Sequence, residues 1–189
     1  MPATKKSAKK ASAKPVGNPE AELASFLAKF TPEIAALTEA ILAKMRTRYP
    51  MALELVYDNY NALAIGYAPI ERTSSAIFSI AVYPQWVSLF FLQAKALPDP
   101  HKLLQGNGKQ VGYIRLASPA TLDEPAVRTL MLEAESRAAV LFDPKQKHRL
   151  IIKSISAKQR PRRPAETTPP TETIESAGKK KSAAKKKST

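Results

Sequence analysis

The residues of this sequence with the clearest chemistry are lysines and arginines gathered near its two ends. Residues 1–19 contain five lysines and no acidic residue, and residues 156–189 contain seven lysines and three arginines against three glutamates. These two segments carry +12 of the formal net charge of +14. Lysine-rich segments bind polyanions because they displace the counterions of phosphates, which requires no contact with bases. We therefore expect both ends to bind nucleic acid without sequence preference.

The candidate phosphate contacts are Lys5, Lys6, Lys9, Lys10, Lys14, Lys158, Arg160, Arg162, Arg163, Lys179, Lys180, Lys181, Lys185, Lys186 and Lys187. Two other interpretations of such charge stay open. A basic segment often does no more than keep a protein soluble, and an anionic membrane attracts the same charges. The two ends lack the aromatic or aliphatic anchors of membrane-bound segments, so nucleic acid is favoured over a membrane as the partner.

A second candidate site is a small ligand-binding or anion-binding patch in the middle of the chain. Its candidate residues are Tyr57, Asp58, Asn59, Tyr60, Lys102, Gly106, Gly108, Lys109 and Arg115. Residues 57–61 are either a polar turn or one wall of a pocket for a small molecule of unknown identity. The glycines invite comparison with a phosphate-binding loop, but the spacing of that motif and its following helix are missing, so a tight turn is favoured.

Aromatic strand residues offer a further, weaker possibility. Most of them are expected to pack inside the protein, among them Tyr67, Tyr83 and Trp86. If Tyr113 and Arg115 share a face of the sheet that no helix covers, that face could stack on bases. No RNA-recognition signature accompanies them.

The sequence shows no arrangement typical of catalysis, of a metal site or of a cofactor site. It contains no cysteine, and His101 and His148 are its only histidines and lie apart in sequence. No serine has the setting of a hydrolase nucleophile. We therefore expect a non-enzymatic protein without metal or cofactor. The Lys-rich beginning has no apolar segment after it, which favours a cytoplasmic location, with association with the nucleoid as a possibility.

Two helices are predicted at the start of the middle region. Asn18-Pro19-Glu20 and Thr31-Pro32-Glu33 are both helix-start signals, with a capping side chain before a proline. Apolar residues follow each signal at helical spacing, and Tyr49-Pro50 ends the second helix. A third helix is predicted from Asp123-Glu124-Pro125 to Asp143-Pro144, with a buried stripe that runs through Leu141.

Strands are predicted between the second and third helices. The runs 52–57, 62–67, 75–83, 86–92 and 110–116 are rich in β-branched and aromatic residues and are separated by turn residues. Such short connections favour an antiparallel meander. Residues 149–155 are a candidate for a last edge strand. The prediction is an α+β domain over residues 18–155, with the helices on one face of an antiparallel sheet of about five strands. Disordered basic tails over 1–17 and 156–189 flank it.

The element order and the stretch LLQGNGKQVGYIRLASPATLDEPAVRTLMLEA resemble the YdhG-like family of small bacterial domains, which belongs to the frataxin-like and YjbR-like structural group. The resemblance covers roughly residues 22–136, and its most specific part is Leu104, Gly106, Gly108, Lys109, Ile114, Arg115 and Leu116. It implies a frataxin-like sandwich, while the basic tails resemble those of linker histones. The family has no settled activity.

Some members of that family are described as frataxin-like iron chaperones, which makes iron binding the alternative function. Iron delivery of that kind needs a dense acidic surface, because hard cations prefer carboxylate oxygen. The available carboxylates are scattered: Glu20, Glu22, Glu33, Glu39, Glu54 and Asp58. Ordinary solvated helix faces explain them better, so iron binding stays behind nucleic-acid binding, beside a small-ligand module.

Overall fold

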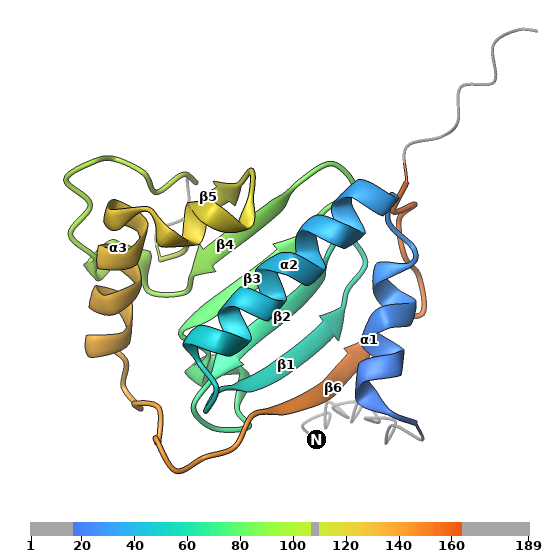
Figure 1. Cartoon of the computed structure of the whole chain (residues 1–189), viewed down its shortest axis with the longest axis horizontal. Coiled ribbons are helices and arrows are strands. Elements are labelled where there is room, and N and C mark those ends of the chain that lie inside the picture. The colour runs from blue at the N-terminus through green and yellow to red at the C-terminus, as the bar shows by residue number, and fades with distance from the viewer. Residues whose placement is uncertain (1–16, 107–109, 164–189) are drawn as a thin grey trace, which may run out of the picture.

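The computed structural model describes residues 17–106 and 110–163, which form an α+β fold with an open sheet (Figure 1). The elements are α1 (Pro19–Leu27), α2 (Pro32–Arg48), β1 (Leu53–Asp58), β2 (Leu63–Ala68), β3 (Phe78–Val82), β4 (Val87–Phe91), β5 (Gly112–Leu116), α3 (Pro125–Ser136) and β6 (Arg149–Ile155). The two early helices, the later helix and the strand positions agree with the sequence prediction. Asn107, Gly108 and Lys109 lie outside the described residues, as do both chain ends.

Both predicted helix starts are confirmed. The Asn18 side chain accepts a hydrogen bond from the Glu20 backbone N–H at 3.0 Å, and Thr31 does the same for Ile34 at 3.4 Å. A proline follows each capping residue at the first helical position, where its missing N–H costs nothing. Local sequence is therefore sufficient to position both helix starts.

The sheet has the strand order β5-β4-β3-β2-β1-β6. The first five strands pair as the predicted antiparallel meander. The predicted edge strand over residues 149–155 is confirmed as β6, but it differs from the predicted antiparallel sheet because it pairs with β1 in parallel, at the opposite edge from β5. A parallel neighbour needs a long crossover, and the chain between α3 and β6 provides it by passing around the end of the sheet (Figure 1).

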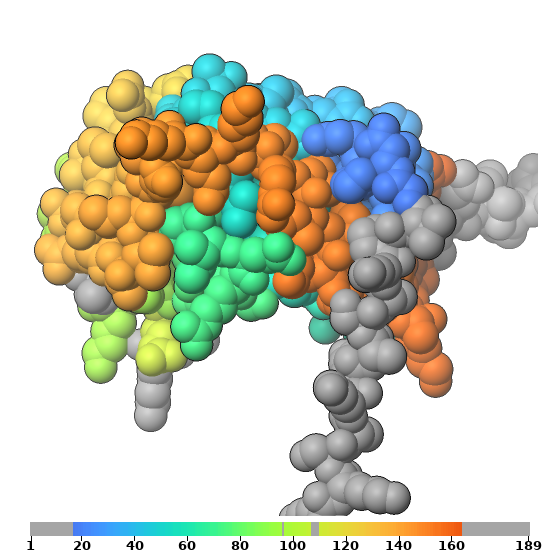
Figure 2. Space-filling view, turned by 90° about the horizontal axis from the view of Figure 1, so that it is seen from below, coloured from blue at the N-terminus to red at the C-terminus, as the bar shows by residue number. Residues whose placement is uncertain are grey.

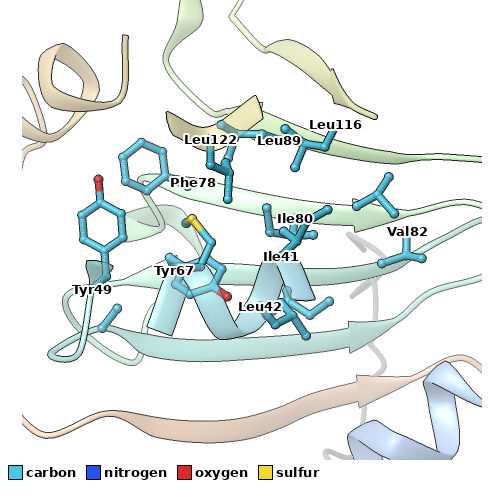
Figure 3. Packing of buried hydrophobic residues seen from close by; sticks show 14 of the residues in the cluster. Ile41, Leu42, Tyr49, Tyr67, Phe78, Ile80, Val82, Leu89, Leu116 and Leu122 are labelled. Carbon is cyan, nitrogen blue, oxygen red and sulfur yellow. The ribbon is translucent and has the colours of Figure 1, made fainter. Parts of the chain in front are cut away.

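All three helices pack on one face of the sheet. α1, α2 and α3 bury Phe26, Ile41 and Leu130 in a single hydrophobic cluster with one set of alternating strand side chains. Figure 3 shows Ile41 and Leu42 of α2 in one cluster with Tyr67, Ile80 and Leu89 of the strands. This arrangement matches the predicted placement of the helices and leaves the other face of the sheet without an α-helix among the described residues. A three-residue 3-10 turn at Thr73–Ser75, in the connection after β2, contacts that face at Tyr57.

Helix α3 is shorter than predicted. It ends at Ser136, not before Asp143, and Leu141 of its expected buried stripe is 60% exposed. The reason is Phe142, which is buried and packs on Tyr49 with ring centroids 5.3 Å apart. A helix continued through 142 would direct the chain away from this contact and from the far edge of the sheet, where β6 begins.

The fold continues past Ile155, where the sequence placed its boundary with the basic tail. Residues 156–163 pack on the domain: the Ser156 N–H bonds to the Asp58 carbonyl, and the Arg160 N–H to the Tyr60 carbonyl. Arg162 is only 4% exposed. In the space-filling view this segment, in deep orange, lies beside α1 (Figure 2). Within the described residues, no helix is both long and apolar enough to span a membrane.

Candidate nucleic-acid interface

Asp58 is the centre of a buried ionic cluster at the end of β1. Its carboxylate is 1% exposed and accepts from Lys29 Nζ at 2.6 Å, Gln159 Nε2 at 2.6 Å and Arg162 Nη2 at 2.9 Å. The Arg162 guanidinium also lies over the Phe30 ring, 5.3 Å from its centroid. These contacts join the segment after β6 to β1 and to the connection between α1 and α2. Asp58 and Arg162, both candidate binding residues, serve here to hold the fold together.

The other basic candidates in this segment divide into two kinds. Arg163 donates to the backbone carbonyls of Phe30 and Ala28, both at 2.9 Å, and so holds the turn that follows α1. Lys158 and Arg160 are exposed and remain accessible to a polyanion. The remaining lysine candidates, at positions 5–14 and 179–187, lie outside the described residues, as do Gly108 and Lys109 of the predicted patch.

Among the described residues of the predicted ligand or anion patch, Tyr57 and Arg115 lie far apart. Tyr57 and Arg115 stand in one cross-strand row, but β2, β3 and β4 lie between them. Four strand spacings amount to about 19 Å. Asn59 and Tyr60 are exposed in the turn after β1, and Lys102 is exposed in the connection after β4.

Gly106 belongs to a close contact with a strand. Its φ of +117° favours glycine, and a Cβ at this position would lie 3.5 Å from the Tyr113 ring. The neighbouring Gln105 pairs with Tyr113 through two backbone hydrogen bonds. The glycine thus lets the chain pass beside β5, while residues 107–109 of the turn that the sequence favoured lie outside the described residues.

A second buried ionic cluster surrounds Glu54, and sequence reasoning missed it. The Glu54 carboxylate is 0% exposed and accepts from Arg46 Nε at 3.0 Å and from Arg46 Nη2 at 2.7 Å. His148 Nε2 lies 3.3 Å from the same carboxylate. Burial raises the pKa of Glu54, but His148 and Arg46 outweigh that effect and hold the pKa below its ordinary value. A lone acidic residue in an apolar strand run was the available signal, since such a residue needs a buried partner.

The two clusters bear on the iron alternative. The carboxylate oxygens of Glu54 and Asp58 already contact basic side chains of the protein itself. Among residues 17–106 and 110–163, no three His, Cys, Asp or Glu side chains gather as a metal site would require. The acidic residues of the first helices therefore add no metal-binding cluster in this part of the chain.

The helix-free face of the sheet carries a strip of aromatic residues near the β4–β5 edge. Alternation along β4 and β5 places Trp86, Phe90, Tyr113 and Arg115 on this face, opposite the core residues Leu89 and Ile114. Tyr83, which precedes the turn between β3 and β4, pairs with Trp86 through its backbone N–H. We call Tyr83, Trp86, Phe90, Tyr113 and Arg115 the aromatic strip.

Side chains within the aromatic strip are ordered by contact with one another. The rings of Tyr83 and Trp86 stack with centroids 5.3 Å apart, and those of Phe90 and Tyr113 with centroids 5.2 Å apart. The Arg115 guanidinium lies over the Trp86 ring, 4.4 Å from its centroid. Burial and the neighbouring Tyr113 raise the pKa of Tyr83. The four aromatic side chains are half-buried, and Arg115 is exposed.

Small residues occupy the helix-free face beside the strip. The row that ends at Arg115 passes through Ala64, Ala81 and Ser88, and the row that ends at Tyr113 passes through Gly66 and Ser79. Ser88 Oγ is buried and has no hydrogen-bond partner among the described residues. At the β1 end of these rows, Leu55 packs with Ala76 of the β2–β3 connection, and Tyr57 bonds to Thr73 at 2.6 Å.

Comparison with known proteins finds no relative. No family model, no curated protein and no solved structure matches the chain. The chemistry of the site therefore rests on this chain's own residues. Aromatic faces next to an arginine can stack on unpaired bases and contact phosphate, while the ionic clusters around Glu54 and Asp58 have their partners already in place.

Three hollows on the surface bear on the possibility of a small-ligand module. One of about 210 Å³ lies between α2 and α3 and is lined by Arg48, Tyr49, Met51, Arg128, Met131 and Glu135, with Leu132 at its rim. One of about 360 Å³ is lined by Lys95, Leu104 and Val111 among others, and a smaller one by Ser74 and Val140. Residues 57–61, the predicted pocket wall, line none of these three.

Proposed function

We propose that this chain is a non-enzymatic, intracellular protein that binds nucleic acid without reading its sequence. The observation that carries the proposal is the distribution of charge. Residues 1–16 contain five lysines and no acidic residue, and residues 164–189 contain six lysines against three glutamates. Dense lysine segments on both sides of one domain suit the sequence-independent neutralisation of phosphates. Association with the nucleoid is the location that this activity implies.

The packing of residues 156–163 changes how the charge is divided. Once these residues are counted with the domain, residues 17–163 carry +6 of the net +14, and the two ends carry the remaining +8. Arg162 and Arg163 are engaged with the fold, whereas Lys158 and Arg160 are exposed. The domain therefore adds its own positive surface to that of the ends.

A salt titration of duplex DNA binding tests the proposal. Six to eight phosphate contacts predict a slope of about −5 to −7 when the logarithm of the association constant is plotted against that of salt concentration. Replacing the eleven terminal lysines by glutamine in the full-length chain should make the slope shallower by about 0.9 per lost contact. Fluorescence anisotropy with one labelled duplex at several salt concentrations measures both quantities.

A matched control raises the positive charge of one end instead of lowering it. Glu166→Gln, Glu172→Gln and Glu175→Gln together raise the charge of the same segment at the same length, and should strengthen binding. Equal slopes for the wild type and the lysine-to-glutamine variant would contradict the proposal, because the ends would then contribute no phosphate contact.

The YdhG-like resemblance and its frataxin-like sandwich form part of the proposal. The order of elements from α1 to α3 is compatible with both. Iron binding remains the second function that the resemblance suggests, and no contact in the described residues favours it over nucleic-acid binding.

A further inference from the structure

We propose that the aromatic strip binds unpaired bases, so that the protein holds single-stranded nucleic acid more tightly than duplex. This inference rests on the proposed nucleic-acid function and names the form of nucleic acid that the folded domain selects. The terminal lysines supply attraction to any phosphate chain, and the strip adds contacts that only exposed bases can make.

The strip has the composition of a stacking surface. Four aromatic side chains and an arginine occupy one helix-free area of about three strands, and each has a partner in contact that limits its motion. Ordered aromatic side chains lose little freedom on binding, and every base offers a π-face, so stacking on them is tolerant of sequence. This tolerance agrees with the sequence-independent binding proposed for the lysine-rich ends.

Charge favours nucleic acid as the occupant of this surface. Arg115 is exposed over Trp86, where its guanidinium can stack on a base with its outer side and donate to a phosphate from its edge. Residues 17–163 carry a net charge of +6. A second copy of the chain would bring a like charge to the same face, and a peptide or lipid would leave the ring stacking without a complementary partner.

Duplex bases cannot use the strip in the same way. Their faces are stacked on one another, and exposing one costs a few kcal/mol. Ser79, which is half-buried beside the strip, has a short side chain and adds little bulk next to the rings, whereas Ala81 is buried. An extended single strand can lie across such a surface with its bases turned toward the rings.

Trp86 provides a direct readout because it is the only tryptophan of the chain. In the full-length protein, titration with an oligothymidine of about 16 nucleotides should quench its fluorescence. Inorganic polyphosphate and a duplex of equal length should bind, as shown by competition with a labelled oligonucleotide, and should leave the tryptophan emission unchanged. The difference separates stacking at the strip from charge neutralisation elsewhere.

Variants then assign the contact to the strip. Tyr113→Ala and Arg115→Ala should each weaken oligothymidine binding by between about 5-fold and 150-fold and change duplex binding by less than about 3-fold. Arg115→Lys keeps the charge and removes the planar group. Its affinity for oligothymidine should therefore be closer to that of Arg115→Ala than to that of the wild type. Arg128→Ala, which removes an exposed arginine from α3, is the matched control and should affect both forms equally and weakly. Circular dichroism and thermal unfolding verify that each variant is folded.

Each unfavourable result has one meaning. If Tyr113→Ala and Arg115→Ala bind single strand and duplex as tightly as the wild type does, the proposed role of the aromatic strip is overturned. Equal quenching of Trp86 by polyphosphate would overturn it as well. Either result leaves the proposed function in place. Failure of the wild type to bind single strand, duplex or polyphosphate would overturn both. A dimer in light scattering that Arg115→Glu dissociates would show that a second copy covers the face, and would also overturn the inference.

Discussion

Replacing Arg46 by methionine should lower the free energy of unfolding by about 3 kcal/mol at neutral pH. The substitution removes the arginine that donates to the Glu54 carboxylate, which is 0% exposed, and leaves His148 Nε2 beside it at 3.3 Å. Arg46 itself is partly exposed, so the cost comes from the uncompensated buried carboxylate and not from the arginine. Urea unfolding followed by circular dichroism measures the change.

The pH dependence of this effect has a definite sign. The pKa of Glu54 is lowered in the folded protein, so its contribution to stability is present above the ordinary carboxyl pKa near 4.5 and is lost as pH falls through the folded value. In Arg46→Met the carboxyl loses the partner that lowered its pKa, and protonation relieves the cost of burial. The difference between the wild type and the variant should therefore shrink as the pH falls through the ordinary carboxyl range and toward the lowered pKa of the wild type.

Two controls separate the buried pair from general effects. The double variant Arg46→Met/Glu54→Met replaces the pair by apolar groups and should recover most of the lost stability. Arg137→Met removes the exposed partner of Glu133 and should cost no more than about 0.5 kcal/mol. If Arg46→Met lowered the free energy of unfolding as little as Arg137→Met does, that result would contradict the assigned role of Glu54.

The second large effect is expected at Asp58. Asp58→Asn keeps the size of the side chain and removes the charge that compensates Arg162, which is 4% exposed, so unfolding should become easier by about 3 kcal/mol. A chain that ends at Ile155 removes Gln159 and Arg162 and should be destabilised similarly. A chain that ends at Arg163 should unfold with the midpoint of the full-length protein. Thermal and urea unfolding of the three variants give the comparison.

This result also determines how the nucleic-acid experiments must be designed. Trimming at Ile155 leaves Asp58 buried without two of its three side-chain partners. Weak DNA binding by that fragment would then reflect a damaged fold as well as lost charge. If the Ile155 and Arg163 chains prove equally stable, residues 156–163 are dispensable for the fold, contrary to their packing here.

Sequence reasoning was reliable wherever a feature depends on neighbouring residues. Asn18 and Thr31 cap their helices because a cap needs only the next few backbone N–H groups. The five meander strands were predictable because apolar alternation and turn residues are local. The end of α3 was not, because Phe142 leaves the helical path to meet Tyr49, which lies 93 positions earlier in the sequence.

The candidate site likewise has features that the sequence alone predicts and others that depend on how the strands pair. The sequence raised a shared face for Tyr113 and Arg115, and alternation along β5 does place both there. It gave no means to see that Trp86 lies beneath Arg115, since the register between β4 and β5 brings them together. Lys102 and Gly106 were grouped with Tyr57 by residue type alone, and strand order separates them.

The lysines and arginines near the two ends show most clearly what each level contributes. The sequence alone determines that positive charge accumulates there, because net charge is a sum that folding does not alter. Only the tertiary structure decides which charges are free to meet a polyanion. Arg162 donates to Asp58, which lies 104 positions earlier, whereas Arg160, two residues away, is exposed. Burial and ion pairing depend on distance in space, and local patterns carry no record of that distance.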